Sequence, residues 1–269
     1  MYSVLLLCGG VAGVTTVLFG FGGGFVVVPL LYTLLIAVHG PDSGIGQAAM
    51  HIAVATSTAL MVFAASLSTW RHHQRQTVQW RLVRPLVGYI AIGAVLGAAA
   101  AVSLSGEWVR WAFIGYLALT IADAILRPGF LHQAGSDVPP MGRGVTAITG
   151  TLMGAVAALL GVGGSVMTVP LMRRRGASMT AATAMANPLS LPMAVSGTAT
   201  YVLLSANHPA LGDWYAGYVD LRALLVLAVG SWLGIRLAST WIGRIPDRLH
   251  ARVYLLLLTM VLVVMAFVG

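Results

Sequence analysis

The residues of this chain best suited to binding a ligand form a glycine-rich run that occurs twice. The first copy is GFGGGFVVVPLL, Gly20 to Leu31, and the second is GVGGSVMTVPLM, Gly161 to Met172, beginning 141 positions later. Glycine lets the backbone turn sharply and approach a ligand closely. We expect a helix to begin after each run. The first amides of such a helix have no intrahelical partners, and its N-terminus is the positive end of the helix dipole. Both features suit the binding of a small oxyanion. We therefore expect the substrate-binding residues to include Gly20, Gly22, Gly23, Gly24 and Phe25 in the first copy and Gly161, Gly163, Gly164 and Ser165 in the second.

A polar pair follows each glycine run at a matching distance. Thr56 and Ser57 align with Asn187 and Pro188, 131 positions later. Such residues in membrane helices often bond only to their own backbone. Their recurrence beside both runs favours a binding role, so we add Thr56, Ser57 and Asn187 to the predicted site.

Prolines and a histidine lie close to the predicted site. Pro29 and Pro170, about one turn beyond each run, remove a backbone donor and either kink the helix for packing or take part in gating. His51 lies five residues before Thr56 and either carries a coupling proton or has a structural role.

Three other ionisable residues are expected to have simpler roles. His72 and His73 adjoin several arginines and are expected to be solvated. Asp123 is expected to pair with Arg127 or to mark a membrane boundary. His, Cys and carboxylate residues nowhere show the spacing of metal ligands, so no metal or cofactor is predicted.

The composition indicates an integral membrane protein. Of 269 residues, 58% are hydrophobic and 8% are charged, and the mean hydropathy is +0.90. So few polar residues cannot cover a soluble globule. The N-terminus lacks a basic segment typical of a cleaved signal peptide, so we expect the first apolar segment to be retained.

Six apolar segments are long enough to cross a bilayer, and two more are interrupted by the glycine runs. The interrupted segments are about residues 3–38 and 145–172. The first is longer than a single crossing of ~30 Å needs, whereas the part that follows each glycine run is too short to cross alone. Both are therefore predicted to be re-entrant hairpins with tips inside the membrane. The six uninterrupted segments are about 48–70, 82–104, 109–126, 179–204, 221–242 and 249–268.

The distribution of arginines supports the hairpins. If both interrupted segments crossed the membrane once, seven arginines would lie on each side, with no positive-inside bias. If both are re-entrant, Arg110 and Arg222 lie on one side and twelve arginines on the other, with Arg236 inside a span. This predicts an inner (plasma) membrane protein with both termini outside and two inverted repeats, residues 1–126 and 143–269, joined by a cytoplasmic linker, residues 127–142.

These motifs resemble the sulfite exporter TauE/SafE family of membrane permeases, whose halves each carry a glycine cluster followed by Val-Pro and an aliphatic residue. Ala55-Thr56-Ser57 also resembles the family pattern, and the resemblance extends over essentially the whole chain. The sequence departs from the pattern at Ser165 and at Asn187-Pro188. The resemblance implies carriage of a small anion such as sulfite, thiosulfate, a sulfonate or a small carboxylate.

We thus expect an all-α membrane protein with eight helical segments that acts as a secondary transporter by alternating access. The alternative is an anion channel through the same hairpins. The chain has neither a catalytic dyad nor a GK[ST] phosphate-loop motif, so an enzyme and a nucleotide-binding protein are both disfavoured. The expected partners are the anion, the lipid bilayer and a coupling H⁺ or Na⁺; nucleic acid is not expected, and a homodimer is left open.

Overall fold

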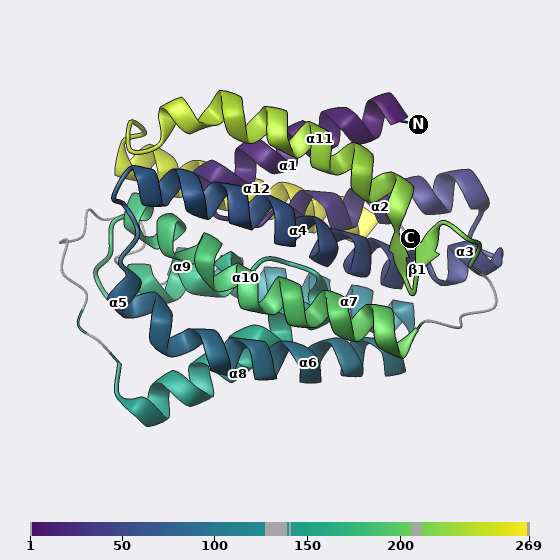
Figure 1. Ribbon diagram of the computed structural model, residues 1–269, viewed down its shortest axis with the longest axis horizontal. Helices are drawn as coiled ribbons and strands as arrows, with labels where there is room; N and C mark the ends of the chain where they lie inside the picture. The colour runs from purple at the N-terminus through teal and green to yellow at the C-terminus, as the bar shows by residue number, and fades with distance from the viewer. Residues whose placement is uncertain (1, 127–138, 140, 206–210, 268–269) are drawn as a thin grey trace.

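The protein is an elongated bundle of helices (Figure 1). The computed structural model describes residues 2–126, 139, 141–205 and 211–267, so most of the predicted linker lies outside the described residues. Besides the helices, the described residues form one short antiparallel hairpin, β1 (Tyr215–Ala216) and β2 (Val219–Asp220). The helices are α1 (Tyr2–Phe19), α2 (Gly24–His39), α3 (Gly44–Gln47), α4 (Ala49–Gln74), α5 (Trp80–Val83), η1 (Arg84–Leu86), α6 (Val87–Ser103), α7 (Gly106–Leu126), α8 (Arg143–Leu160), α9 (Ser165–Arg174), α10 (Met179–Leu204), α11 (Leu221–Ala238), η2 (Ser239–Trp241) and α12 (Asp247–Phe267).

Seven helices of the described chain are long and apolar enough to cross a membrane. They are α1, α4, α5 with α6, α7, α8, α11 with η2, and α12. The 26-residue α10 is as long as α4 but is not among them, because its Thr, Ser, Asn and Pro residues lower its hydropathy. All six predicted uninterrupted segments correspond to helices with similar bounds.

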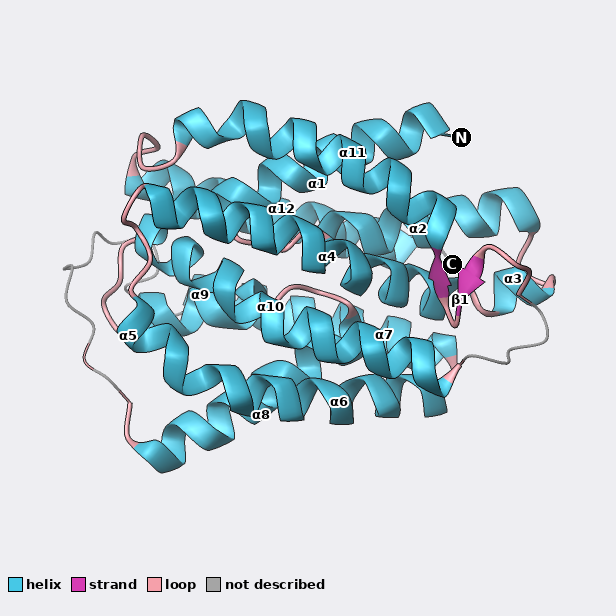
Figure 2. Ribbon diagram, in the orientation of Figure 1, coloured by secondary structure: helices cyan, strands magenta, loops and turns pink. Residues whose placement is uncertain are grey.

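Both glycine runs interrupt helices where the sequence predicts. In Figure 1, α1 runs from the N-terminal end of the bundle toward its middle, and α2 returns to the end from which α1 started. The pair α8 and α9 does the same from the opposite end. Figure 2 shows the two connections as short loops near the middle of the bundle. The first helix of each hairpin has 18 residues, about 27 Å at 1.5 Å per residue.

Each hairpin packs most extensively against a helix from the other half of the sequence. The largest helix contacts in the structure are α1 with α11 and α6 with α8. Glycines make these contacts close: a Cβ added at Gly9 would lie 3.0 Å from the Leu227 Cα, and one added at Gly93 would lie 2.8 Å from the Thr151 carbonyl carbon. Small residues four apart let membrane helices approach at such distances.

The glycines of these contacts are themselves repeated in the sequence. Gly9 and Gly13 of α1 recur 141 positions later as Gly150 and Gly154 of α8, the same offset as that of the glycine runs. Their partners recur 137 positions apart: Gly93 and Gly97 lie on α6, and Gly230 and Gly234 on α11. Equivalent hairpins therefore pack against equivalent helices.

The longest helices, α4 and α10, form the centre of the bundle and contact each other. In the most apolar 18-residue stretch of α4, 78% of the residues are buried, whereas the corresponding share is 33% in α7 and in α12. The outer helices expose large apolar side chains such as Leu119, Leu237 and Phe267, as helices that face lipid do. The centre of the bundle is thus the part best shielded from the surroundings.

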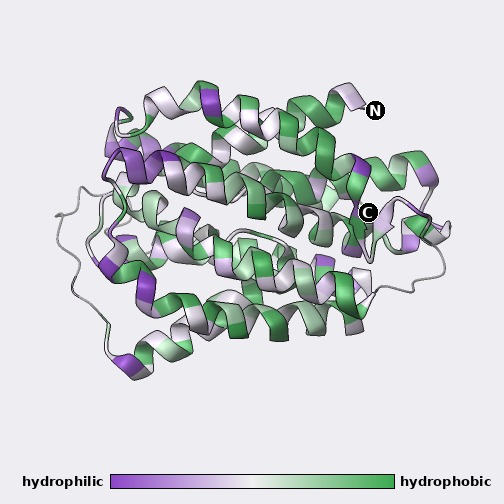
Figure 3. Cartoon of the chain, viewed as in Figure 1, coloured by the Kyte–Doolittle hydropathy of each residue, from purple (hydrophilic) through white to green (hydrophobic). Residues whose placement is uncertain are grey.

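Hydrophilic residues gather at one end of the bundle (Figure 3). This end holds the last turn of α4, α5, the start of α8, the end of α9 and the start of α12, which carry most of the described arginines. Among the described arginines, Arg110 at the start of α7 and Arg222 at the start of α11 lie at the other end, where α1 begins.

Candidate functional site

The first glycine loop ends α1 and begins α2 within four residues. The Gly20 amide donates to the Thr16 carbonyl at 2.9 Å, and the first helical bond of α2 runs from Val27 to Gly23 at 3.2 Å. Gly20, Gly22 and Gly23 have φ of 75°, 66° and 89°, a region that favours glycine. All residues from Gly20 to Phe25 are buried.

The second glycine loop, residues 161–164, has the same length and is tied to α10. Gly161 ends α8 with φ 65°. The Gly164 amide donates to the Ser190 hydroxyl at 3.1 Å, and the Ser190 hydroxyl donates to the Ala186 carbonyl at 2.9 Å. One of the amides predicted to face a ligand is therefore bonded within the protein. The helix α9 begins at Ser165, whose side chain lies outside the described residues.

The two loops touch each other in the middle of the bundle. A Cβ added at Gly22 would lie 3.3 Å from the Gly163 Cα, and one added at Gly163 would lie 2.6 Å from the Phe21 carbonyl oxygen. The Ser57 hydroxyl, on α4, donates to the Gly161 carbonyl at 2.9 Å and lies beside Gly24. The predicted residues Gly22, Gly24, Gly161, Gly163 and Ser57 are thus brought together.

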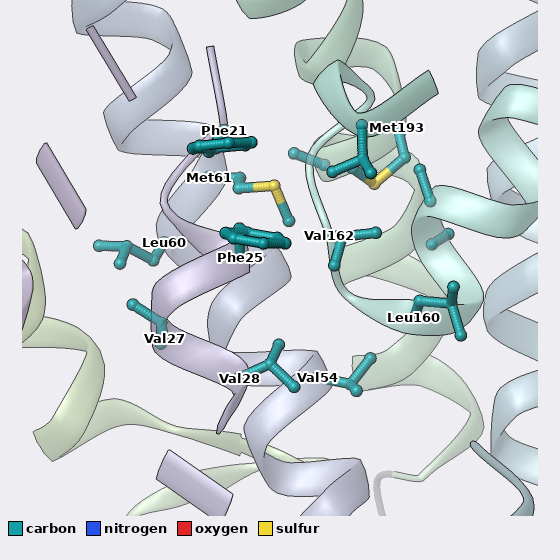
Figure 4. Close-up of a cluster of buried hydrophobic side chains, with 14 of the residues drawn as sticks. Phe21, Phe25, Val27, Val28, Val54, Leu60, Met61, Leu160, Val162 and Met193 are labelled. Atoms are coloured by element: carbon teal, nitrogen blue, oxygen red, sulfur yellow. The ribbon is translucent and has the colours of Figure 1, made fainter. Parts of the chain in front are cut away.

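Apolar and aromatic side chains surround the contact between the loops (Figure 4). Phe21 stacks on Phe25 with ring centroids 4.5 Å apart and on Tyr254 at 5.0 Å. In Figure 4, Met61 lies between these phenylalanines and Val162 of the second loop. The groups of this cluster that can bind an anion are therefore backbone amides and hydroxyls, in surroundings of low polarity.

The other two predicted polar residues have different partners. The Thr56 hydroxyl accepts a hydrogen bond from the Asp220 amide at 2.9 Å, so it connects α4 to the start of α11. Asn187 is fully buried on α10, and its Nδ2 donates to the Thr183 carbonyl at 3.3 Å. Its Oδ1 has no hydrogen-bond partner among the described residues. A buried, unpaired acceptor is costly and calls for a hydrogen-bond donor, so it is the Nδ2 of Asn187, and not its Oδ1, that suits an oxyanion.

The two predicted prolines lie in different surroundings. Pro29 is buried within α2, and its carbonyl accepts from the Thr33 hydroxyl at 2.7 Å. Pro170 lines a cavity of about 450 Å³ between α7, α8 and α9, near the arginine-rich end. The cavity extends from Arg174, which forms an ion pair with Asp123, to Val166, the second residue of α9.

A second cavity adjoins the first hairpin at the opposite end of the bundle. It measures about 340 Å³ and is lined by residues of α1, α2 and α11 and by the β-hairpin. His39 and Arg222 lie on its wall, and the Arg222 guanidinium lies 4.4 Å from the centre of the Trp214 ring. Each hairpin therefore has a cavity along its side, one at each end.

His51 lies away from the contact between the loops. Its Nε2 is 3.0 Å from both the Ala101 and Leu104 carbonyls, and its ring stacks on Tyr218 at 5.0 Å. The residue closes the end of α6, which is a structural role of the kind that the sequence left open. A part in proton coupling stays a prediction.

The prediction for His72 needs correction, and that for Asp123 is not tested. His72 is 2% exposed rather than solvated, because α4 continues to Gln74 and turns this side chain inward, where Nε2 lies 2.8 Å from the Val17 carbonyl. The neighbouring His73 is exposed. Asp123 forms an ion pair with Arg174 of α9, 51 residues later, which local spacing could not show. Its predicted partner, Arg127, lies outside the described residues, so that pairing stays a prediction.

Comparisons with known proteins agree over nearly the whole chain. A family model described as "Sulfite exporter TauE/SafE" matches residues 5–265. A "Probable membrane transporter protein" of Haemophilus influenzae is 27% identical over 91% of this chain and 92% of its own length. A probable membrane transporter protein of Methanocaldococcus jannaschii is 24% identical over 88% of this chain and 86% of its own. The probable membrane transporter protein MamO of Paramagnetospirillum magneticum is 25% identical over 90% of this chain and 41% of its own.

Proposed function

Because the chain belongs to the sulfite exporter TauE/SafE family, a family of multi-pass membrane transporters, we propose that it is a secondary transporter that moves a small oxyanion past its two glycine loops. The family and the names of the relatives indicate a transporter and not an enzyme. The observation that carries the proposal is the contact of the Gly22 and Gly163 backbones, inside the bundle and between two broken helices.

The two halves are proposed to be inverted repeats. The matching offsets of the glycine loops and of the close-packed glycines support this relation, as does the entry of the two hairpins from opposite ends. Inverted repeats with broken helices that meet near the midplane are a recurrent architecture among secondary transporters. The predicted division into residues 1–126 and 143–269 is kept within this proposal.

The two cavities suggest how access alternates. The loops are in contact and their residues are buried, so under this proposal the described conformation is closed at the loops. Movement of one hairpin relative to the other half would open the loops to one cavity at a time. The cavity beside α9 would serve the arginine-rich side, and the cavity beside α1 and α2 the other side.

The orientation follows from the arginines. Cytoplasmic loops carry an excess of Lys and Arg, so the arginine-rich end is assigned to the cytoplasm. Both termini then lie outside the inner membrane, as the sequence predicts. This assignment places the loop between α9 and α10 inside and the loop between α2 and α4 outside.

The proposed substrate is a sulfur-containing oxyanion or a small carboxylate. Short helices that start at glycines offer amides and a partial positive charge to a compact anion. The Asn187 Nδ2 adds a second N–H on α10, and the Ser57 hydroxyl on α4 would donate to the anion once it is released from the Gly161 carbonyl. Larger anions would have to displace the phenylalanine rings that pack around the loops.

The test is anion exchange in proteoliposomes that contain the purified protein. Liposomes are loaded with unlabelled sulfite, thiosulfate, sulfoacetate or acetate, and uptake of the labelled anion is measured. Saturable uptake that is accelerated by internal anion supports a carrier. Large ohmic currents without such acceleration would instead establish the channel, and the absence of any anion flux would overturn the proposed function.

A further inference from the structure

The broken helix α1 ends on two histidines. Because α1 stops at Phe19, its last carbonyls have no intrahelical amide partners. The His72 Nε2, from α4, lies 2.8 Å from the Val17 carbonyl, and the His250 Nε2, from α12, lies 2.8 Å from the Leu18 carbonyl. Each Nε2 donates its hydrogen, so two imidazoles from two other helices complete the end of α1.

The second nitrogens of the two rings have different surroundings. The His72 Nδ1 lies 2.9 Å from the Thr77 hydroxyl. The His250 Nδ1 is buried and has no hydrogen-bond partner among the described residues. With Nε2 donating to a carbonyl, the neutral His250 ring carries an unshared electron pair on Nδ1, which makes it a proton acceptor. Buried ionisable residues inside membrane proteins are costly and commonly functional.

Charged groups around His250 would respond to a proton there. Asp247, one turn earlier on α12, forms an ion pair of 2.9 Å with Arg173 of α9 and accepts from the Met179 amide at 2.6 Å. The Arg173 side chain is fully buried. On the α4 side the ionisable neighbours are His72 and, beyond it, Arg75. The adjoining segments of α1 and α10 contribute Val17, Leu18, Thr180 and Thr183, which do not ionise.

His250 also contacts the residue just before the first glycine loop. The Phe19 ring, adjacent to Gly20, packs edge-on against the imidazole with centroids 4.9 Å apart. A cavity of about 10 Å³ is lined by both histidines and by Trp241, Ile242, Gly243 and Ile245, which lie at the arginine-rich end. This size is at the lower limit for one water molecule, which would place a proton donor beside the histidines.

We propose that His250 binds the proton that couples transport, an inference that rests on the proposed transport function. The proton adds to the lone pair of Nδ1 and gives an imidazolium with two N–H donors. The positive ring strengthens the bond to Leu18 on the first hairpin, attracts Asp247 and repels Arg173. Proton binding thereby weakens the ion pair that anchors α9, and with it the second hairpin, while the first hairpin is held more firmly.

The transport test compares wild type with His250→Gln. The matched control is His73→Gln, because His73 lies next to His72 at the end of α4 but is exposed. Liposomes receive labelled thiosulfate, whose charge is constant near neutral pH, with or without an imposed pH gradient. The wild type and His73→Gln should accumulate the anion in response to the gradient, and His250→Gln should exchange it without that response. Gradient-driven accumulation by His250→Gln at the wild-type level would overturn the inference; no flux from wild type would instead count against the proposed function.

A second test needs no substrate. Met172, beside Arg173 on α9, is fully buried, so Met172→Cys in a Cys8→Ser background reports opening of the second hairpin by maleimide labelling. Labelling rates are measured at about pH 6 and about pH 8, on either side of the ordinary histidine pKa, and their ratio is taken. This ratio is then divided by the same ratio measured in His250→Gln, which removes the effect of pH on the thiol. Because one linked proton shifts an equilibrium by up to about tenfold per pH unit, a quotient of about ten or more is expected. A quotient near one would show that His250 does not control the hairpin.

Discussion

At the scale of single residues, glycine is required in the loops for two separate reasons. Gly22 and Gly161 adopt positive φ, which is strained for other residues. Gly163 has ordinary backbone angles but no room, because the Phe21 carbonyl occupies the place of a Cβ. The sequence indicates both glycine runs but does not distinguish these reasons, because the second arises from a contact with the other run.

We expect Gly163→Ala to lower anion exchange at least about tenfold, since the methyl group would push the two loops apart and a displacement of about 1 Å in a binding site can cost a hundredfold. Gly115→Ala is the matched control, because a Cβ there meets no atom within 4 Å. Exchange is measured in proteoliposomes with equal amounts of protein. Equal exchange by the two variants would mean that the loop contact is unimportant for transport.

Ser57→Ala removes the hydrogen bond that holds the second loop to α4. We expect a loss of about 1 kcal/mol of stability, since the Gly161 carbonyl loses its donor. The control is Ser66→Ala, whose hydroxyl is exposed and bonds only to its own helix. Thermal unfolding in detergent measures both, and an equal shift of Tm in the two variants would contradict this role of Ser57.

At the scale of helices, the sequence predicts the elements well and their pairing poorly. All six uninterrupted spans and both hairpins follow from runs of apolar residues and from the two glycine interruptions. The pairing of α1 with α11 and of α8 with α6 depends on contacts about 60 to 220 residues apart in sequence. The repeated glycines Gly9, Gly13, Gly150 and Gly154 are a signal that could have indicated it, because small residues four apart mark close helix contacts.

We expect Gly97→Val to destabilise the protein strongly, since a Cβ there would lie 2.7 Å from the Ala155 Cα on α8. Overpacking of a close contact typically costs about 1–3 kcal/mol. Gly115→Val on α7, with no neighbour within 4 Å, should leave Tm nearly unchanged. A Tm of Gly97→Val as high as that of the control would refute the close packing of α6 and α8.

The ion pair between α9 and α12 gives a second test at this scale. Asp247→Asn leaves the buried Arg173 guanidinium without its carboxylate, a loss of about 3–5 kcal/mol for a buried pair. The double variant Arg173→Met with Asp247→Asn should recover part of this loss, because the buried positive charge is removed together with its carboxylate. Tm is measured for the single and double variants. A double variant less stable than Asp247→Asn would show that Arg173 stabilises the protein by contacts other than this ion pair.

At the scale of the whole molecule, the arginine distribution and the two interrupted segments already predict the arrangement of hairpins in the structure. His72 shows where such reasoning fails: it lies beside arginines in sequence, but one more helical turn buries it against α1. The histidine cluster at the end of α1 could not be predicted, because His72 and His250 are 178 residues apart in the chain and meet only through the fold.

The central claim, that both interrupted segments enter and leave the membrane on the same side, is tested most directly by cysteine labelling in a Cys8→Ser background. Ser3→Cys is exposed in the first turn of α1 and Asp42→Cys is exposed after α2, whereas Arg143→Cys is at the first residue of α8 and Arg175→Cys follows α9. A membrane-impermeant maleimide added to intact spheroplasts should label the first two variants and spare the second two. Labelling of Ser3→Cys and Asp42→Cys from opposite sides of the membrane would contradict the account.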